Sequence, residues 1–135
     1  MRSISFPYTI HKGLAIPYIP LALKIGKTWR RFWAFVDSGA TYSIVRTSEI
    51  EDLNFDYKRG KLVNVQVGDG GFIPVYLHQL VISLDDFEFP ATVGFSSRLG
   101  VEFNLLGRKD VFEIFDVTFS DSRGEITFKT TPDQH

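Results

Sequence analysis

The sequence contains no cysteine, a single methionine and almost no net charge. Without cysteine it can form no disulfide, thiolate nucleophile or cysteine-ligated zinc or iron–sulfur centre. Its 15 basic and 16 acidic residues give a formal charge of −1. This balance argues against nucleic acid or an anionic membrane as the main partner. We therefore expect the partners to be neither.

Long apolar runs are also missing. No run approaches the roughly 18 residues that a membrane-spanning helix needs. Residues 1–7 lack the apolar core of a secretory signal peptide, so we expect a cytoplasmic protein. The three histidines, His11, His78 and His135, are scattered without the spacing of a metal-binding pair. No metal and no organic cofactor are expected.

What the sequence does contain is a repeated alternation of apolar and polar residues in short runs. Val63, Val65 and Val67 share one face of residues 62–67, and similar runs occur near both ends of the chain. A period of two, with glycine between the runs, is typical of antiparallel strands. Residues 121–124, Asp-Ser-Arg-Gly, predict a hairpin loop between the last two strands.

These patterns predict one all-β domain over residues 1–135, built as a sandwich or barrel. Helix is expected only in one or two short segments, at residues 47–53 and 109–114. The first opens with a threonine cap and acidic residues, as helices often do. Trp29 and Trp33 are expected to lie in the core.

One carboxylate stands out because of its position. Asp37 follows the apolar run 32–36 directly and precedes three small residues, Ser38, Gly39 and Ala40. Burying a carboxylate is costly unless it is hydrogen-bonded or shares a proton. Ser38 and the Gly39 N–H are candidates to hold it. By itself, however, Asp-Ser-Gly is more often an ordinary turn than a catalytic one.

A second segment echoes the first about seventy residues later. Residues 102–107 again run from apolar residues into a glycine, this time without an aspartate, and Arg108 follows. Taken together, Phe-Val-Asp-Ser-Gly-Ala at 35–40 and Leu105, Leu106, Gly107 and Arg108 resemble the retropepsin family of aspartic proteases. The resemblance implies a closed β-barrel protomer in which Asp37 is catalytic. It also implies that residues 105–108 support the catalytic turn.

The same resemblance gives a role to the glycine-rich segment between the two motifs. Gly68, Asp69, Gly70 and Gly71 lie where the family has the flap that covers bound substrate. The simpler interpretation is a type I′ hairpin turn around Asp-Gly. The two interpretations are compatible because a flap is itself a hairpin.

Aspartic-protease chemistry needs two neighbouring carboxylates, one ionised and one protonated. The chain contains a single Asp-Ser-Gly, so the second carboxylate must come from a second copy. We therefore expect a homodimeric aspartic endopeptidase that takes extended peptide or protein substrates and pairs two Asp37 side chains across a two-fold axis.

Two alternatives stay open. One is a catalytically silent retropepsin-like module that dimerises or binds peptides. The other is a plain β-barrel interaction domain in which Asp37 only caps a turn. The silent module stays open because of a missing aspartate. Retroviral members often carry an aspartate two residues after the alanine, where it pairs with the later arginine. Residues 41–43 are Thr-Tyr-Ser instead, so the sequence leaves the partner of Arg108 open.

Overall fold

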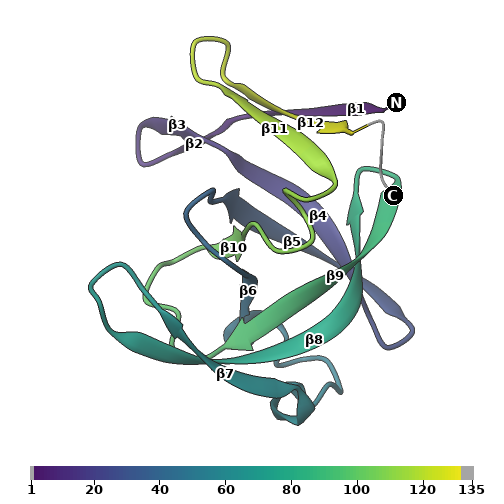
Figure 1. Cartoon of the computed structure of the whole chain (residues 1–135), viewed down its shortest axis with the longest axis vertical. Coiled ribbons are helices and arrows are strands. Elements are labelled where there is room, and N and C mark those ends of the chain that lie inside the picture. Colours follow the sequence, from purple (N-terminus) through teal and green to yellow (C-terminus); the bar gives the residue numbers. More distant parts are fainter. Residues whose placement is uncertain (1, 132–135) are drawn as a thin grey trace.

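The computed structural model describes residues 2–131, and strands make up most of that range (Figure 1). The strands are β1 (Ser3–Pro7), β2 (Thr9–His11), β3 (Leu14–Ile16), β4 (Tyr18–Ile25), β5 (Thr28–Val36), β6 (Ser43–Arg46), β7 (Lys61–Gln66), β8 (Phe72–Leu84), β9 (Phe87–Ser96), β10 (Asn104–Leu106), β11 (Phe115–Ser120) and β12 (Glu125–Thr130). Two single-turn 3-10 helices, η1 (Thr47–Glu49) and η2 (Tyr57–Arg59), separate β6 from β7. The predicted all-β class is confirmed.

The main sheet returns on itself. Its strands pair in the order β4-β5-β10-β6-β9-β8-β7, and β4 also pairs with β8. Hydrogen bonding therefore runs around a ring from β4 back to β4, with β7 outside the ring against β8. A separate three-stranded sheet, β1-β12-β11, contains both the first and the last strand, and β2 and β3 form a small hairpin (Figure 1).

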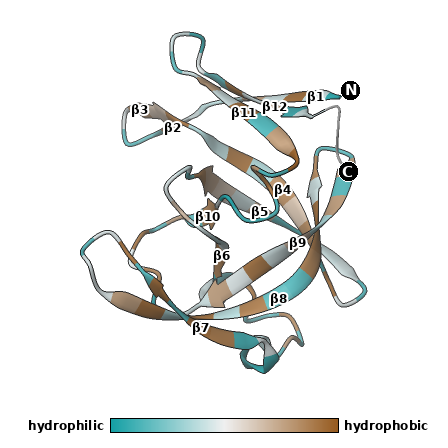
Figure 2. Cartoon of the chain, viewed as in Figure 1, coloured by the Kyte–Doolittle hydropathy of each residue, from teal (hydrophilic) through white to brown (hydrophobic). Residues whose placement is uncertain are grey.

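The two sheets share one hydrophobic core. Hydrophobic residues alternate with polar ones along the strands (Figure 2), as the period of two predicted. One buried cluster contains Leu23 and Phe95 from the ring and Phe115 and Phe128 from the three-stranded sheet. Burying each phenylalanine contributes roughly 1.5–3 kcal/mol to folding. The core thus joins elements from both ends of the described chain.

The prediction for the two tryptophans is wrong. Trp29 is 42% exposed and Trp33 is 45% exposed. Both lie on β5, where Phe32 and Val36 face the core. Because side chains alternate along a strand, Trp29 and Trp33 point to the opposite face.

The helix predictions hold only in part. Residues 47–53 form η1 and a following turn, in which the Leu53 N–H donates to the Ile50 carbonyl. Residues 109–114 form successive turns and no helix, because Asp110 has a φ of 65° that interrupts right-handed helix. The predicted hairpin at residues 121–124 is confirmed and joins β11 to β12.

Candidate active site

Asp37 lies where β5 ends, in a tight turn. Its backbone N–H donates to the Leu106 carbonyl at 2.9 Å, and its carbonyl accepts the Ala40 N–H at 3.2 Å. Its carboxylate Oδ1 accepts the Gly39 N–H at 2.9 Å. The side chain is half-buried, whereas Ser38 is exposed. The glycine N–H predicted from the sequence therefore holds the carboxylate.

The echo between the two motifs corresponds to a direct pairing of strands. β10 runs parallel to β5, with Asn104 opposite Ala34 and Leu106 opposite Val36. On its other side β10 pairs antiparallel with β6. The second motif thus lies between the strand that enters the Asp37 turn and the strand that leaves it.

Residues 107–109 form hydrogen bonds with residues 40–43, which follow Asp37. The Arg108 N–H donates to the Ala40 carbonyl at 2.9 Å, and the Lys109 N–H donates to the Thr41 carbonyl at 2.8 Å. The Gly107 N–H donates to the buried Ser43 hydroxyl at 3.0 Å. These bonds connect the backbone after β10 to residues 40–43, which follow the Asp37 turn.

The partner that the sequence left open for Arg108 is the turn itself. Its Nη1 donates to the Ser38 carbonyl at 3.2 Å. The guanidinium carbon also lies 5.2 Å from the centre of the Phe112 ring, a cation–π contact. Arg108 therefore contacts the Asp37 turn directly, without an aspartate at residues 41–43.

An open groove of about 670 Å³ begins at Asp37. The groove is lined by the Asp37 turn, by residues 98–101 and by the β7–β8 hairpin. Its apolar lining includes Ile44, Val65 and Ile73, which belong to a second hydrophobic cluster apart from the main core. The groove therefore combines a carboxylate with an apolar wall.

The β7–β8 hairpin has a three-residue tip. The Val67 N–H donates to the Gly71 carbonyl at 2.9 Å, which leaves residues 68–70 as the loop. Gly70 alone has a positive φ, 88°, and Asp69 accepts the Gly71 N–H at 2.8 Å. A type I′ turn needs positive φ at both central residues, so that interpretation is wrong. A three-residue loop closed by a left-handed glycine fits instead.

Similarity to known proteins was found at the level of structure. No protein-family model and no curated protein matches the sequence. A retropepsin-like aspartic protease from Rickettsia conorii superposes with a TM-score of 0.61 at 14% identity, covering 94% of this chain and 91% of its own. The chain has the retropepsin-like fold.

Two other structures agree. The retroviral protease-like domain of Ddi1 from Leishmania major gives a TM-score of 0.55 at 15% identity, over 88% of this chain and 96% of its own. The EIAV protease, solved in complex with the inhibitor HBY-793, gives 0.51 at 16% identity, over 74% of this chain and 88% of its own. The retropepsin-like fold predicted from the two short motifs is therefore confirmed.

Within this retropepsin-like fold, two buried polar residues were not predicted from the sequence. Asn104 is 1% exposed; its Nδ2 donates to the Trp33 carbonyl at 2.9 Å and its Oδ1 accepts the Arg46 N–H at 2.8 Å. Ser43 is 4% exposed and bonds Gly107. Each is a polar residue beside an apolar run, which is the only sequence signal that marks them. Asn104 thus links β10 to β5 and β6, and Ser43 links β6 to the residue that follows β10.

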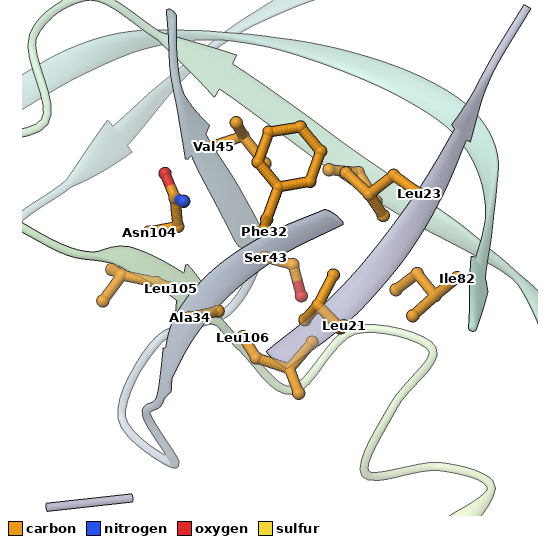
Figure 3. A pocket seen from close by; sticks show the side chains of 11 residues that line it. Leu21, Leu23, Phe32, Ala34, Ser43, Val45, Ile82, Asn104, Leu105 and Leu106 are labelled. Carbon is orange, nitrogen blue, oxygen red and sulfur yellow. The ribbon is translucent and has the colours of Figure 1, made fainter. Parts of the chain in front are cut away.

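The interior of the ring contains a small void beside these two residues. Figure 3 shows Ser43 and Asn104 among the apolar side chains that surround a small void. The void measures about 10 Å³, at the lower limit of the roughly 10–15 Å³ that one water molecule needs. We therefore regard it as a gap in core packing.

Within residues 2–131, no group of three or more histidine, aspartate or glutamate side chains is arranged to hold a metal ion. The described part of the chain contains no helix long and apolar enough to cross a bilayer.

Proposed function

We propose that this chain is one subunit of a homodimeric aspartic endopeptidase whose catalytic carboxylate is Asp37. The main support is the position of that carboxylate. It is half-buried, oriented by the Gly39 N–H and located in an open, largely apolar groove. The similarity to three proteins described as proteases or protease-like supports peptide hydrolysis as the reaction.

The dimer follows from the number of carboxylates. In the described residues, Asp37 and Asp69 are the acids that line the groove. Asp69 lies on the hairpin tip, and its carboxylate accepts the Gly71 N–H. A second Asp37, related by a two-fold axis, supplies the equivalent acid that the reaction needs.

The proposed reaction uses the two Asp37 side chains as acid and base. The ionised carboxylate takes a proton from a water molecule as the water oxygen attacks the scissile carbonyl. The protonated carboxyl gives its proton to the carbonyl oxygen, which forms a neutral tetrahedral diol. Transfer of a proton to the amide nitrogen then breaks the C–N bond and releases an amine and a carboxylic acid.

The hairpin tip at Gly68, Asp69, Gly70 and Gly71 acts in this proposal as a flap. Gly68 and Asp69 of this tip line the same groove as Asp37, and the glycines let the backbone approach a bound peptide closely. An extended peptide lying between the flap and the catalytic turn forms main-chain hydrogen bonds, with alternate side chains in the apolar wall. Lifting and closing the flap admits substrate and excludes water.

The test compares wild type with Asp37→Asn, which keeps the size of the side chain but removes the ionisable group. Both are incubated with a peptide library from about pH 3 to about pH 7, because carboxyl groups change charge in the acidic part of this range. The exposed Asp116, on β11, provides the matched control Asp116→Asn. We expect cleavage by wild type and the control, loss of cleavage in Asp37→Asn, and inhibition by a statine-type transition-state mimic.

Intact peptides at every pH would refute the protease and favour the silent peptide-binding module instead. The cytoplasmic location expected from the sequence stays a prediction.

A further inference from the structure

Three charged residues among those described line the groove. Asp37 and Asp69 are acidic, and Arg98 is basic. Arg98 belongs to the segment after β9 that forms the wall beside the catalytic turn. No ion pair within residues 2–131 involves its guanidinium. A charged donor with five N–H groups thus lies exposed at the place where substrate would bind.

The base of Arg98 is fixed although its side chain is exposed. Its backbone N–H donates to the Ser96 hydroxyl at 3.1 Å, and the same hydroxyl donates to the Pro74 carbonyl at 2.8 Å. Ser96 is only 2% exposed, and Pro74 lies on β8, which continues into the flap hairpin. The backbone of Arg98 is therefore tied to β8 through Ser96.

From this arrangement we propose that Arg98 selects substrates that carry an acidic side chain beside the apolar residues of the cleavage site. This inference rests on the proposed function. Asp and Glu pair with a guanidinium through two parallel hydrogen bonds, whereas Gln offers a single neutral acceptor. Apolar neighbours in the peptide occupy the wall formed by Ile44, Val65 and Ile73.

The two-fold dimer makes the proposal more specific. Each half of the groove carries its own Arg98, so an acidic residue is favoured at two substrate positions. These positions lie the same number of residues before and after the scissile bond. A partly exposed guanidinium–carboxylate pair, covered by the flap, gives a preference for Glu over Gln of about fivefold.

The experiment uses peptides with an apolar pair at the centre and either Glu or Gln at each flanking position in turn. kcat/KM is measured for wild type, Arg98→Gln, Arg98→Glu and the control Arg59→Gln, which removes an equal charge from η2. We expect the Glu preference at two symmetric positions in wild type and the control. It disappears in Arg98→Gln and reverses in Arg98→Glu. A preference that survives in Arg98→Gln, or that is absent from wild type, overturns the proposal.

A binding measurement separates this inference from the protease itself. Fluorescently labelled Glu and Gln peptides are titrated into Asp37→Asn and into the Asp37→Asn/Arg98→Gln double variant. We expect Asp37→Asn to bind the Glu peptide about fivefold more tightly than the Gln peptide. The double variant is expected to bind the two peptides equally. If no peptide is cleaved but this difference holds, the protease is refuted and the role of Arg98 is supported. If peptides are cleaved but both proteins bind the two peptides equally, only the role of Arg98 is refuted.

Discussion

Gly107 and Gly39 lie in the two turns that meet at Asp37, yet their surroundings differ. A Cβ at position 107 would lie 2.4 Å from the Tyr42 carbonyl oxygen and 2.8 Å from that of Ala40. Both are backbone atoms, which cannot move aside cheaply, and the Ala40 carbonyl is also held by the Arg108 N–H. A Cβ at position 39 would lie 3.3 Å from the Asp37 carboxylate, which can shift by a few tenths of an ångström.

Alanine is therefore expected to affect mainly stability at position 107 and mainly activity at position 39. Gly107→Ala lowers the free energy of unfolding by about 2–3 kcal/mol, as overpacking does. Gly39→Ala costs less than about 1 kcal/mol but lowers kcat about tenfold, because the carboxylate is displaced. Urea unfolding and peptide cleavage measure the two quantities. Similar stability losses for both variants would contradict this view of the site.

At the same scale, the sequence was informative where the chemistry is local. The bond from Gly39 to Asp37 spans two residues, so the motif itself predicted it. Asn104 and Ser43 were missed because their partners, Trp33, Arg46 and Gly107, lie 58 to 71 residues away. The outward tryptophans were missed because hydrophobicity alone does not say which face of β5 is buried.

Among the elements, β10 is joined to its neighbours by a buried side-chain amide as well as by backbone pairing. It has three residues, and Asn104 connects it to β5 and β6 through the Trp33 carbonyl and the Arg46 N–H. Asn104→Ala leaves both backbone groups without that partner, which costs about 2–3 kcal/mol for buried groups. Chemical denaturation checks this value, with the exposed Asn54→Ala as control. A loss as small as that of the control would show that the amide is not needed.

The turns after β10 make stability depend on pH. The Asp110 Oδ2 accepts the Thr92 N–H of β9 at 2.7 Å, and its Oδ1 lies 3.5 Å from Lys109 Nζ. Burial raises the pKa of Asp110, but the bonds from Thr92 and the charge of Lys109 outweigh it and the pKa is lowered. Because the folded pKa lies below the unfolded value of about 3.9, Asp110 stabilises the fold above that pH. This stabilisation is lost as pH falls through the folded pKa.

We expect Asp110→Asn to be less stable than wild type near neutral pH, with a difference that shrinks below about pH 4. Urea midpoints measured across this range test the sign, and Asp116→Asn serves as the control. A difference that grows as pH falls would contradict the account.

This element also explains a limit of sequence-based prediction. Residues 109–114 have a helical pattern of composition, but Asp110 has a left-handed backbone and its side chain accepts a hydrogen bond from Thr92 of β9. Such a long-range constraint leaves no local signal. By contrast, the strands and the 121–124 hairpin follow from period and turn residues, which are local properties.

For the whole molecule, two short motifs were enough to predict the retropepsin-like fold, since their parallel pairing organises the ring. The assembly is a different matter. The chain brings one Asp-Ser-Gly to the groove, and the proposed chemistry needs two. Everything proposed for function therefore depends on catalysis shared between two copies.

Subunit mixing tests that claim most directly. Wild type at constant concentration is mixed with increasing Asp37→Asn, and peptide cleavage is measured after the subunits have exchanged. At equal amounts we predict about half of the original activity, because half of the wild-type chains then lie in mixed, inactive dimers, and a further decline with excess variant. Wild-type activity that stays constant at every ratio would mean that each chain works alone, which contradicts the account.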